Sequence, residues 1–186
     1  MSLAMSLAMR RVLCVFALAA LPLVLLSACN RTAPDGAIAN MRFDPAEAAY
    51  IKAPGRATIE GQAFLRDKSG QVNVRYAAGE TVRLVPATAY AQARFAHFYG
   101  GGKFVPASAI PKIEPDPNYA AYTRATKAGP TGRFTFDQVA PGRYYLTVQL
   151  IWRPKDSFLS EGGAMYEEVA VTGKETDAVK VLVSGD

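Results

Sequence analysis

Apolar and polar residues alternate along most of the chain after residue 56, in runs short enough to be single β-strands. In the first run, ATIEGQAFLR at residues 57–66, the positions on one side carry Ile59, Gly61, Ala63 and Leu65. The same alternation predicts further strands at residues 72–76, 80–86, 119–127, 132–139, 143–152, 166–171 and 179–183. Because Gly- and Pro-containing turns separate the runs, the pattern predicts an all-β, antiparallel sandwich, with residues 119–127 as an edge strand.

The segment TGRFTFDQVAPGRYYLTVQL, residues 131–150, carries the strongest alternation. Its period of two predicts a core made of Phe134, Phe136, Tyr144, Leu146, Val148 and Leu150, and Trp152 continues the same face. Between the two runs, Pro141 and Gly142 predict a type II turn with Gly142 at positive φ. The two phenylalanines are then expected to face Tyr144 and Leu146 across the core.

One insertion, residues 88–118, departs from the strand pattern. ATAYAQARFAHFYGGGKF predicts a helix that begins after Thr88 as N-cap and is ended by the glycines 100–102. An apolar stripe on it consists of Ala91, Phe95, Phe98 and Tyr99. The proline-rich VPASAIPKIEPDPNY that follows predicts an extended loop across the sandwich.

A second stripe of this helix carries Tyr90, Arg94 and His97. Such a face could bind an anionic or sugar-like group, or it could be the solvated outer face of an amphipathic lid, and the sequence favours the second interpretation. Loops on a rigid scaffold often carry function. Any ligand is therefore expected on the insertion and on the loop after Trp152, with Tyr90, Arg94, His97, Tyr99 and Arg153 as candidate binding residues.

The N-terminal segment has the features of a secretory signal peptide. Arg10 and Arg11 precede the 15-residue apolar stretch 12–26, which is shorter than a membrane span. The stretch ends in Leu-Ser-Ala-Cys, which resembles the lipobox of bacterial lipoproteins. That resemblance implies that residues 1–28 are removed, that Cys29 carries a diacylglyceryl group and that its amine is acylated. Residues 29–56, rich in Gly, Pro, Ala, Asn and Asp, are then expected to form a tether with a short helical turn at 45–50.

The same resemblance bears on location. In lipoproteins of this kind an aspartate after the cysteine favours retention in the inner membrane, and this chain has Asn30 there. The resemblance therefore implies anchoring in the outer membrane of a bacterial envelope, facing the periplasm or the cell surface.

Composition argues against several classes of function. The net charge is +5, or +3 without residues 1–28, and no Lys/Arg block indicates nucleic-acid binding. His97 is the single histidine, and Cys14 and Cys29 are the only cysteines, which argues against structural zinc and against a Ser-His-Asp triad. Adjacent strand residues such as Glu167 and Glu168 point to opposite faces and cannot act as a carboxylate pair. We expect no metal, no cofactor and no enzymatic activity.

The motif GRFTFDQVAPGRYYLTV resembles carboxypeptidase regulatory-like domains, and TIEGQAF and ETVRLVPA resemble their opening strands. The resemblance covers about residues 57–184 and implies a prealbumin-like (Ig-like) sandwich of about seven strands for the domain 57–186. The insertion after Pro86 departs from the family pattern. Transthyretin-like hydrolases have several histidines and a Tyr-Arg-Gly-Ser end, both of which this chain lacks.

These features predict a non-catalytic, lipid-anchored envelope protein that binds or scaffolds another envelope component, either a protein or a polysaccharide. Its membrane partner would be reached through lipidated Cys29. The alternative that the sequence leaves open is a small envelope hydrolase with an unorthodox site on the helical insertion.

Replacement of the anchoring residue tests the lipoprotein interpretation. Two or three acyl chains hold a protein stably on a bilayer, so Cys29→Ala should move the protein from the membrane pellet to the soluble fraction. Cell fractionation followed by immunoblotting measures this, with Ser27→Thr upstream of the cysteine as the matched control. A Cys29→Ala protein that stays in the pellet as wild type does would contradict the prediction.

Overall fold

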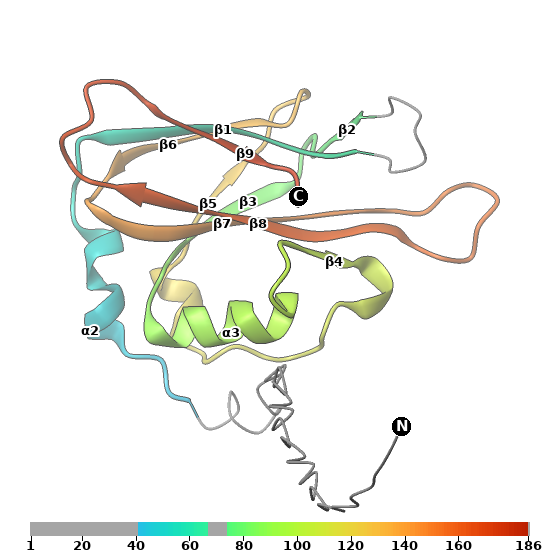
Figure 1. The fold of residues 1–186 in the computed structure, drawn as a ribbon, viewed down its shortest axis with the longest axis horizontal. Coiled ribbons are helices and arrows are strands. Elements are labelled where there is room, and N and C mark those ends of the chain that lie inside the picture. Colours follow the sequence, from blue (N-terminus) through green and yellow to red (C-terminus); the bar gives the residue numbers. More distant parts are fainter. Residues whose placement is uncertain (1–40, 67–73, 186) are drawn as a thin grey trace, which may run out of the picture. The chain divides into compact units, whose positions relative to one another are not determined.

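Two β-sheets pack face to face in the computed structural model, which describes residues 41–66 and 74–185 (Figure 1). In the first sheet the central strand β1 (Ala57–Arg66) pairs with β6 (Arg133–Val139), β9 (Val179–Val183) and the short β2 (Val74–Tyr76). The second sheet has the order β4 (Phe104–Pro106), β8 (Glu161–Val171), β7 (Gly142–Trp152), β3 (Thr81–Pro86) and β5 (Arg124–Lys127).

The predicted all-β sandwich with a short helical insertion is confirmed. Every strand pair in the described residues is antiparallel except that of β1 with β9. The described part of the chain contains nine strands rather than about seven. The prediction missed β4, which lies in the segment expected to be a loop, and β8 begins at Glu161, five residues earlier than predicted. Residues 124–127 form the expected edge strand, after a 3-10 turn at Tyr119–Tyr122.

The main core lies between the two sheets and contains the residues that alternation predicts. All six side chains are at most 5% exposed: Phe134, Phe136, Tyr144, Leu146, Val148 and Leu150. Gly61 lies opposite Phe134 in the sheet, and a Cβ added there would be 2.2 Å from the Phe134 ring. The absence of a side chain at Gly61 therefore makes room for the Phe134 ring.

The connection from β6 to β7 does not form a hairpin, because the two strands belong to different sheets. This places the two phenylalanines across the core from Tyr144 and Leu146, as predicted. The predicted type II turn is wrong: Gly142 begins β7 with φ 159°, close to extended backbone, and the left-handed residue is Gln138, with φ 53°. Gly142 is needed for space, since a Cβ there would lie 2.4 Å from the Tyr50 ring.

Residues 43–51 pack on the sandwich, so this part of the expected tether belongs to the folded domain. The expected helical turn is present as α2 (Pro45–Ala48), capped by Asp44, and the 3-10 turn η1 (Ala49–Lys52). Phe43, Ala48 and Ile51 are buried. Apolar spacing over so few residues was too short to predict this contact. The predicted signal peptide, Cys29 and residues 30–40 of the expected tether lie outside the described residues.

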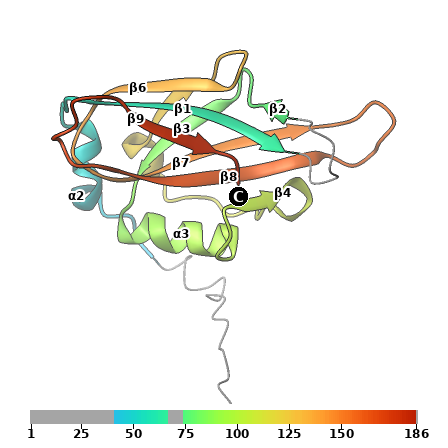
Figure 2. The same ribbon diagram turned by 45° about the horizontal axis from the view of Figure 1, so that its top comes forward.

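Helix α3 (Ala89–Tyr99) covers the outer face of the second sheet (Figures 1 and 2). Its predicted ends are confirmed: the Thr88 hydroxyl accepts a hydrogen bond from the Ala91 amide at 3.2 Å, and Gly100 closes the helix with φ 59°. Ala91, Phe95 and Tyr99 are buried against the sheet, as their stripe predicts, and Phe98 is half-buried beside them. Among residues 41–66 and 74–185, no helix has the length and apolarity needed to cross a bilayer.

Truncation of Phe134 should strongly destabilise the domain. Phe134→Ala removes a buried ring beside Gly61, where a large-to-small change typically costs about 3–5 kcal/mol. Total stabilities of about 5–15 kcal/mol make this a large fraction, so the melting temperature should fall by well over ten degrees. Differential scanning calorimetry measures it. Phe158→Ala, at a side chain that is 98% exposed, is the matched control and should melt as wild type does. A drop of only one or two degrees for Phe134→Ala would place its ring outside the core.

Candidate functional site

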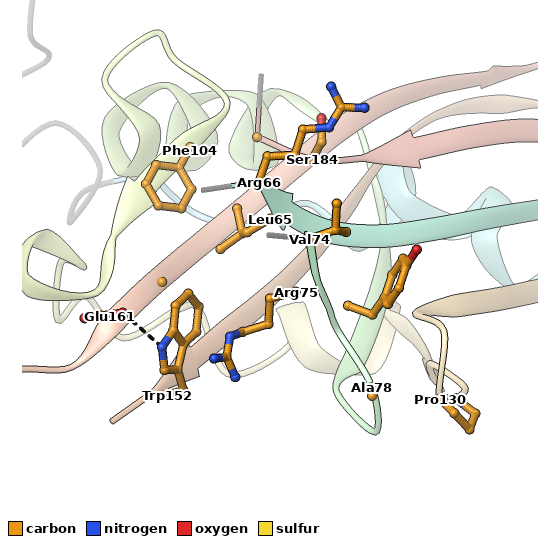
Figure 3. A pocket seen from close by; sticks show the side chains of 13 residues that line it. Leu65, Arg66, Val74, Arg75, Ala78, Phe104, Pro130, Trp152, Glu161 and Ser184 are labelled. Carbon is orange, nitrogen blue, oxygen red and sulfur yellow. Dashed lines mark hydrogen bonds between the residues drawn. The ribbon is translucent and has the colours of Figure 1, made fainter. Parts of the chain in front are cut away.

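A cleft of about 970 Å³ lies at the end of the sandwich where β2 pairs with β1 (Figure 3). The strands β7 and β8 run past the first sheet at this end (Figure 1). We call this cleft the end cleft. Residues from both sheets line it, among them Leu65, Arg75, Tyr76, Phe104, Trp152 and Glu161. Aromatic and charged side chains replace the aliphatic ones of the core there.

Trp152 is the centre of the end cleft. It is the last residue of β7, and its partner in the ladder is Glu161, the first residue of β8. The indole Nε1 donates a hydrogen bond of 3.0 Å to the Glu161 carboxylate (Figure 3). Gly162 follows with φ 81°, and a Cβ there would lie 2.5 Å from the indole ring. The glycine therefore lets the ring lie close against β8.

Arg75 reaches the same indole from the first sheet. It lies in β2 opposite Leu65, whose side chain packs on the main core, so the register turns Arg75 toward the inside of the sandwich. Its guanidinium carbon is 4.2 Å from the centre of the Trp152 ring, a cation–π contact (Figure 3). The indole is thus fixed at its face by Arg75 and at its N–H by Glu161.

A second hollow, of about 540 Å³, lies between α3 and the outer face of the second sheet. We call it the helix groove. Its lining includes Arg83, Arg94, Phe98, Tyr99, Tyr119 and Gln149. It is rich in aromatic rings, as sugar-binding surfaces often are, but most of these rings already have partners.

The rings of the helix groove bind the helix to the sheet. Phe95 stacks on Tyr145 with 4.2 Å between ring centres, and the Tyr99 hydroxyl shares a 2.9 Å hydrogen bond with the Thr147 hydroxyl. Burial raises the pKa of Tyr99 to about 12 and also raises the pKa of Tyr119. Both phenols therefore stay neutral at any physiological pH. The helix groove is therefore mainly the packing interface between α3 and the second sheet.

The sequence-predicted site residues are divided between these places. Arg94 and Tyr99 line the helix groove, and His97 is half-buried on the same helix. Tyr90 is only 4% exposed, beside Phe43. Arg153 is exposed directly after Trp152 and is not among the described residues that line either hollow. The binding role of all five stays a prediction.

The favoured interpretation of the second helix stripe, a solvated outer face, is wrong at Tyr90. Two segments distant in sequence cover it: Phe43 and Tyr119 pack edge-on against its ring. Its hydroxyl oxygen accepts a 2.7 Å hydrogen bond from the Asp116 amide. Arg94 lies over Tyr90 and Tyr119 and donates to the Ile113 carbonyl at 3.3 Å. Tyr90 is therefore a buried member of a small aromatic cluster, and Arg94 packs against its ring.

Sequence reasoning missed Arg75 and Glu161. The single tryptophan at the end of a long alternating run was the available signal. Because β8 was predicted to begin at residue 166, the residue paired with Trp152 was placed in a loop. Arg75 was assigned to a short strand whose face was not predicted.

Carboxylate chemistry and metal binding find little support in the described residues. Within residues 41–66 and 74–185, no three His, Cys, Asp or Glu side chains are grouped so that they could hold a metal ion. Glu167 and Glu168 lie on opposite faces of β8, as predicted. They pair with Lys103 at 2.6 Å and with Arg143 at 3.1 Å. Glu161 is the only carboxylate among the described residues of the end cleft.

Comparison with known proteins gives one informative match. No family model matches the chain, and no curated protein matches it. A crystal structure of protein PA1324 from Pseudomonas aeruginosa, described as a "putative carbohydrate binding protein", is 30% identical, with a TM-score of 0.63. The match covers 77% of this chain and 98% of that one. Two structures of the shaft pilin SpaA from Lactobacillus rhamnosus GG are 11% and 12% identical with TM-scores of 0.28, too low to carry an argument.

The packing of Tyr90 leads to a prediction about stability. Tyr90→Ala should lower the free energy of unfolding by about 3–5 kcal/mol, since it empties the space between Phe43 and Tyr119. Tyr90→Phe keeps the ring and loses only the contact with the Asp116 amide, at a cost of about 1 kcal/mol. Urea denaturation followed by circular dichroism measures both. Equal stability of Tyr90→Ala and wild type would contradict the buried position of this side chain.

Proposed function

Because the chain belongs to the same family as PA1324 of Pseudomonas aeruginosa, we propose that it is a non-catalytic carbohydrate-binding protein and that the end cleft is its binding site. The observation that carries the proposal is the arrangement of Trp152, Arg75 and Glu161 at the opening of that cleft. The relative's description concerns carbohydrate in general. The site assigned to this chain comes from its own geometry.

The end cleft has the size and the chemistry that a sugar needs. Its volume of about 970 Å³ lies within the range of about 300–1,000 Å³ that is usual for small-molecule sites. A sugar ring has apolar C–H faces and polar hydroxyl edges. Leu65, Phe104 and the 41% exposed Tyr76 can contact the faces. The Arg75 guanidinium and the Glu161 carboxylate supply a donor and an acceptor for hydroxyls.

Rigid polar groups favour this cleft over the helix groove. The guanidinium of Arg75 lies on an indole whose N–H is itself hydrogen-bonded, so both charged groups are held before any ligand arrives. Binding then costs little additional side-chain ordering. In the helix groove, Phe95 and Tyr99 are already used to attach α3.

The carboxylate content favours binding over hydrolysis. Most glycoside hydrolases use two carboxyl groups on either side of the scissile bond. Glu161 is the one carboxylate in the described lining of the end cleft, and the described lining of the helix groove contains none. The alternative of a hydrolase on the helical insertion therefore receives no support from these residues.

Location and family type complete the proposal. The Leu-Ser-Ala-Cys sequence supports a lipid anchor at Cys29 in the outer membrane, with the domain exposed to envelope polysaccharide. The GRFTFDQVAPGRYYLTV motif and the two-sheet arrangement support a carboxypeptidase regulatory-like, prealbumin-type sandwich. A binding domain held at a membrane by a short tether would keep its carbohydrate ligand close to the envelope.

The single tryptophan makes the proposal directly testable. A panel of neutral and acidic oligosaccharides is titrated into the mature protein while the emission of Trp152 is followed. A ligand in the end cleft should change this emission in a saturable way, because no other tryptophan contributes. Chromatography of the sugars afterwards should recover them intact. Shortened products would support the hydrolase alternative instead.

Calorimetry with variants locates the site. Trp152→Ala removes the support of Arg75 and should weaken binding at least about tenfold, as expected for an aromatic side chain at the centre of a binding site. Phe98→Ala, in the helix groove, is the matched control and should bind as wild type does. The reverse result, with loss only in Phe98→Ala, would move the site to the groove. No binding by the wild-type protein to any oligosaccharide would refute the proposed function.

A further inference from the structure

The charge of the end cleft points to one class of carbohydrate. We propose that the end cleft selects acidic carbohydrates, glycans that carry hexuronate carboxylates, and that the Arg75 guanidinium is the group that recognises the carboxylate. The inference rests on the proposed function and specifies its ligand.

Arg75 has no anionic partner within the part of the chain that the structure describes. Its guanidinium contacts the Trp152 ring, and its side chain is exposed. By contrast, two cations at the second sheet are paired, Lys103 with Glu167 and Arg143 with Glu168. A guanidinium that lines a cleft and lacks a carboxylate is a site at which a ligand can supply one.

Glu161 does not neutralise Arg75. Although the indole of Trp152 contacts both, the Glu161 carboxylate accepts the indole N–H at 3.0 Å and forms no ion pair with Arg75. Arg66, the last residue of β1, lines the same cleft and is exposed as well. The described lining thus holds two guanidinium groups and one carboxylate, a net positive charge that attracts anions into the cleft.

The geometry of Arg75 suits a carboxylate better than a hydroxyl. A guanidinium is planar and presents its N–H groups around its edge, so donors that do not face the indole are available to a ligand. Two parallel N–H donors match the two oxygens of a carboxylate, and such charge-assisted pairs are roughly twice as strong as bonds between neutral groups. The contact with the indole also restrains the guanidinium before binding.

The test compares each sugar with its own neutral form. Hexuronate trisaccharides of the gluco, galacto and manno series and their methyl esters are titrated into the mature protein by calorimetry at low salt. For at least one series the acid should bind at least about tenfold more tightly than the ester. The difference should shrink at high salt, because salt screens exposed charges.

Variants assign the preference to Arg75. Arg75→Gln should remove the difference between acid and ester, because it weakens binding of the acid much more than binding of the ester. Arg75→Lys keeps the charge but not the paired donors and should retain only part of the preference. Arg83→Gln, which removes an exposed arginine from the helix groove, is the matched control and should keep all of it. Glu161→Gln keeps an acceptor for the indole N–H, removes the negative charge and should increase affinity for the acids.

The outcomes separate the two proposals. If neutral sugars and esters bind as tightly as the acids, carbohydrate binding stands and the acidic preference is wrong. If a preference exists but Arg75→Gln retains it, Arg75 is not the recognising group. If no sugar of either kind binds, both proposals fail. Circular dichroism and melting curves of each variant establish that it is folded, as expected for changes at exposed side chains.

Discussion

The burial of both faces of β7 is the constraint on which the rest of the structure depends. On the inner face, Leu146 and Val148 pack into the core between the sheets. On the outer face, Tyr145 stacks on Phe95 of α3. A strand in the middle of a sheet cannot leave large apolar side chains in water, so the inner face requires the first sheet and the outer face requires a cover. The helical insertion after β3 supplies this cover.

The end cleft follows from the length of the same strand. β7 has 11 residues and pairs with β8 along its whole length, whereas the partners of β1 in the first sheet give way to the three-residue β2. Residues near Trp152 therefore continue the inner face of β7 beyond the well-packed core. An indole is suited to such a boundary, because its body contacts apolar groups while its N–H bonds a charged group such as Glu161.

Local pattern predicted what depends on local sequence. A period of two identified β6 and β7 and their buried residues, and the capping residues Thr88 and Gly100 fixed the ends of α3. Contacts between distant segments were beyond such reasoning. Tyr90 is buried by Phe43, which lies 47 positions earlier, and the sequence around Tyr90 does not predict this contact. The turn after β6 was mistaken because Gly142 is required by the ring of Tyr50, a packing reason rather than a conformational one.

The candidate site was harder to predict than the fold, since it joins residues from three strands. Trp152 and Glu161 meet only because β7 and β8 pair across a long loop, and Arg75 meets them only because two sheets face each other. A sequence gives each residue type but does not show that these three side chains lie together. Composition could still suggest the type of function: with one histidine and two cysteines, the sequence favoured binding over catalysis, and a solved member of the family is described as a "putative carbohydrate binding protein".

Arg75 links the stability of the cleft wall to the charge of the cleft. All three residues of β2 are exposed, so burial contributes little to holding this strand. Its described supports are a short ladder with β1, an edge-on contact of Tyr76 with Phe64 and the contact of Arg75 with Trp152. Such a cation–π contact contributes about 0.5–2 kcal/mol, more when water is excluded from it. A ligand carboxylate on the outer edge of the guanidinium would leave the contact with the indole intact. The ligand would therefore bind to a strand that is already ordered. Little of the free energy of the new ion pair would then be lost to ordering β2.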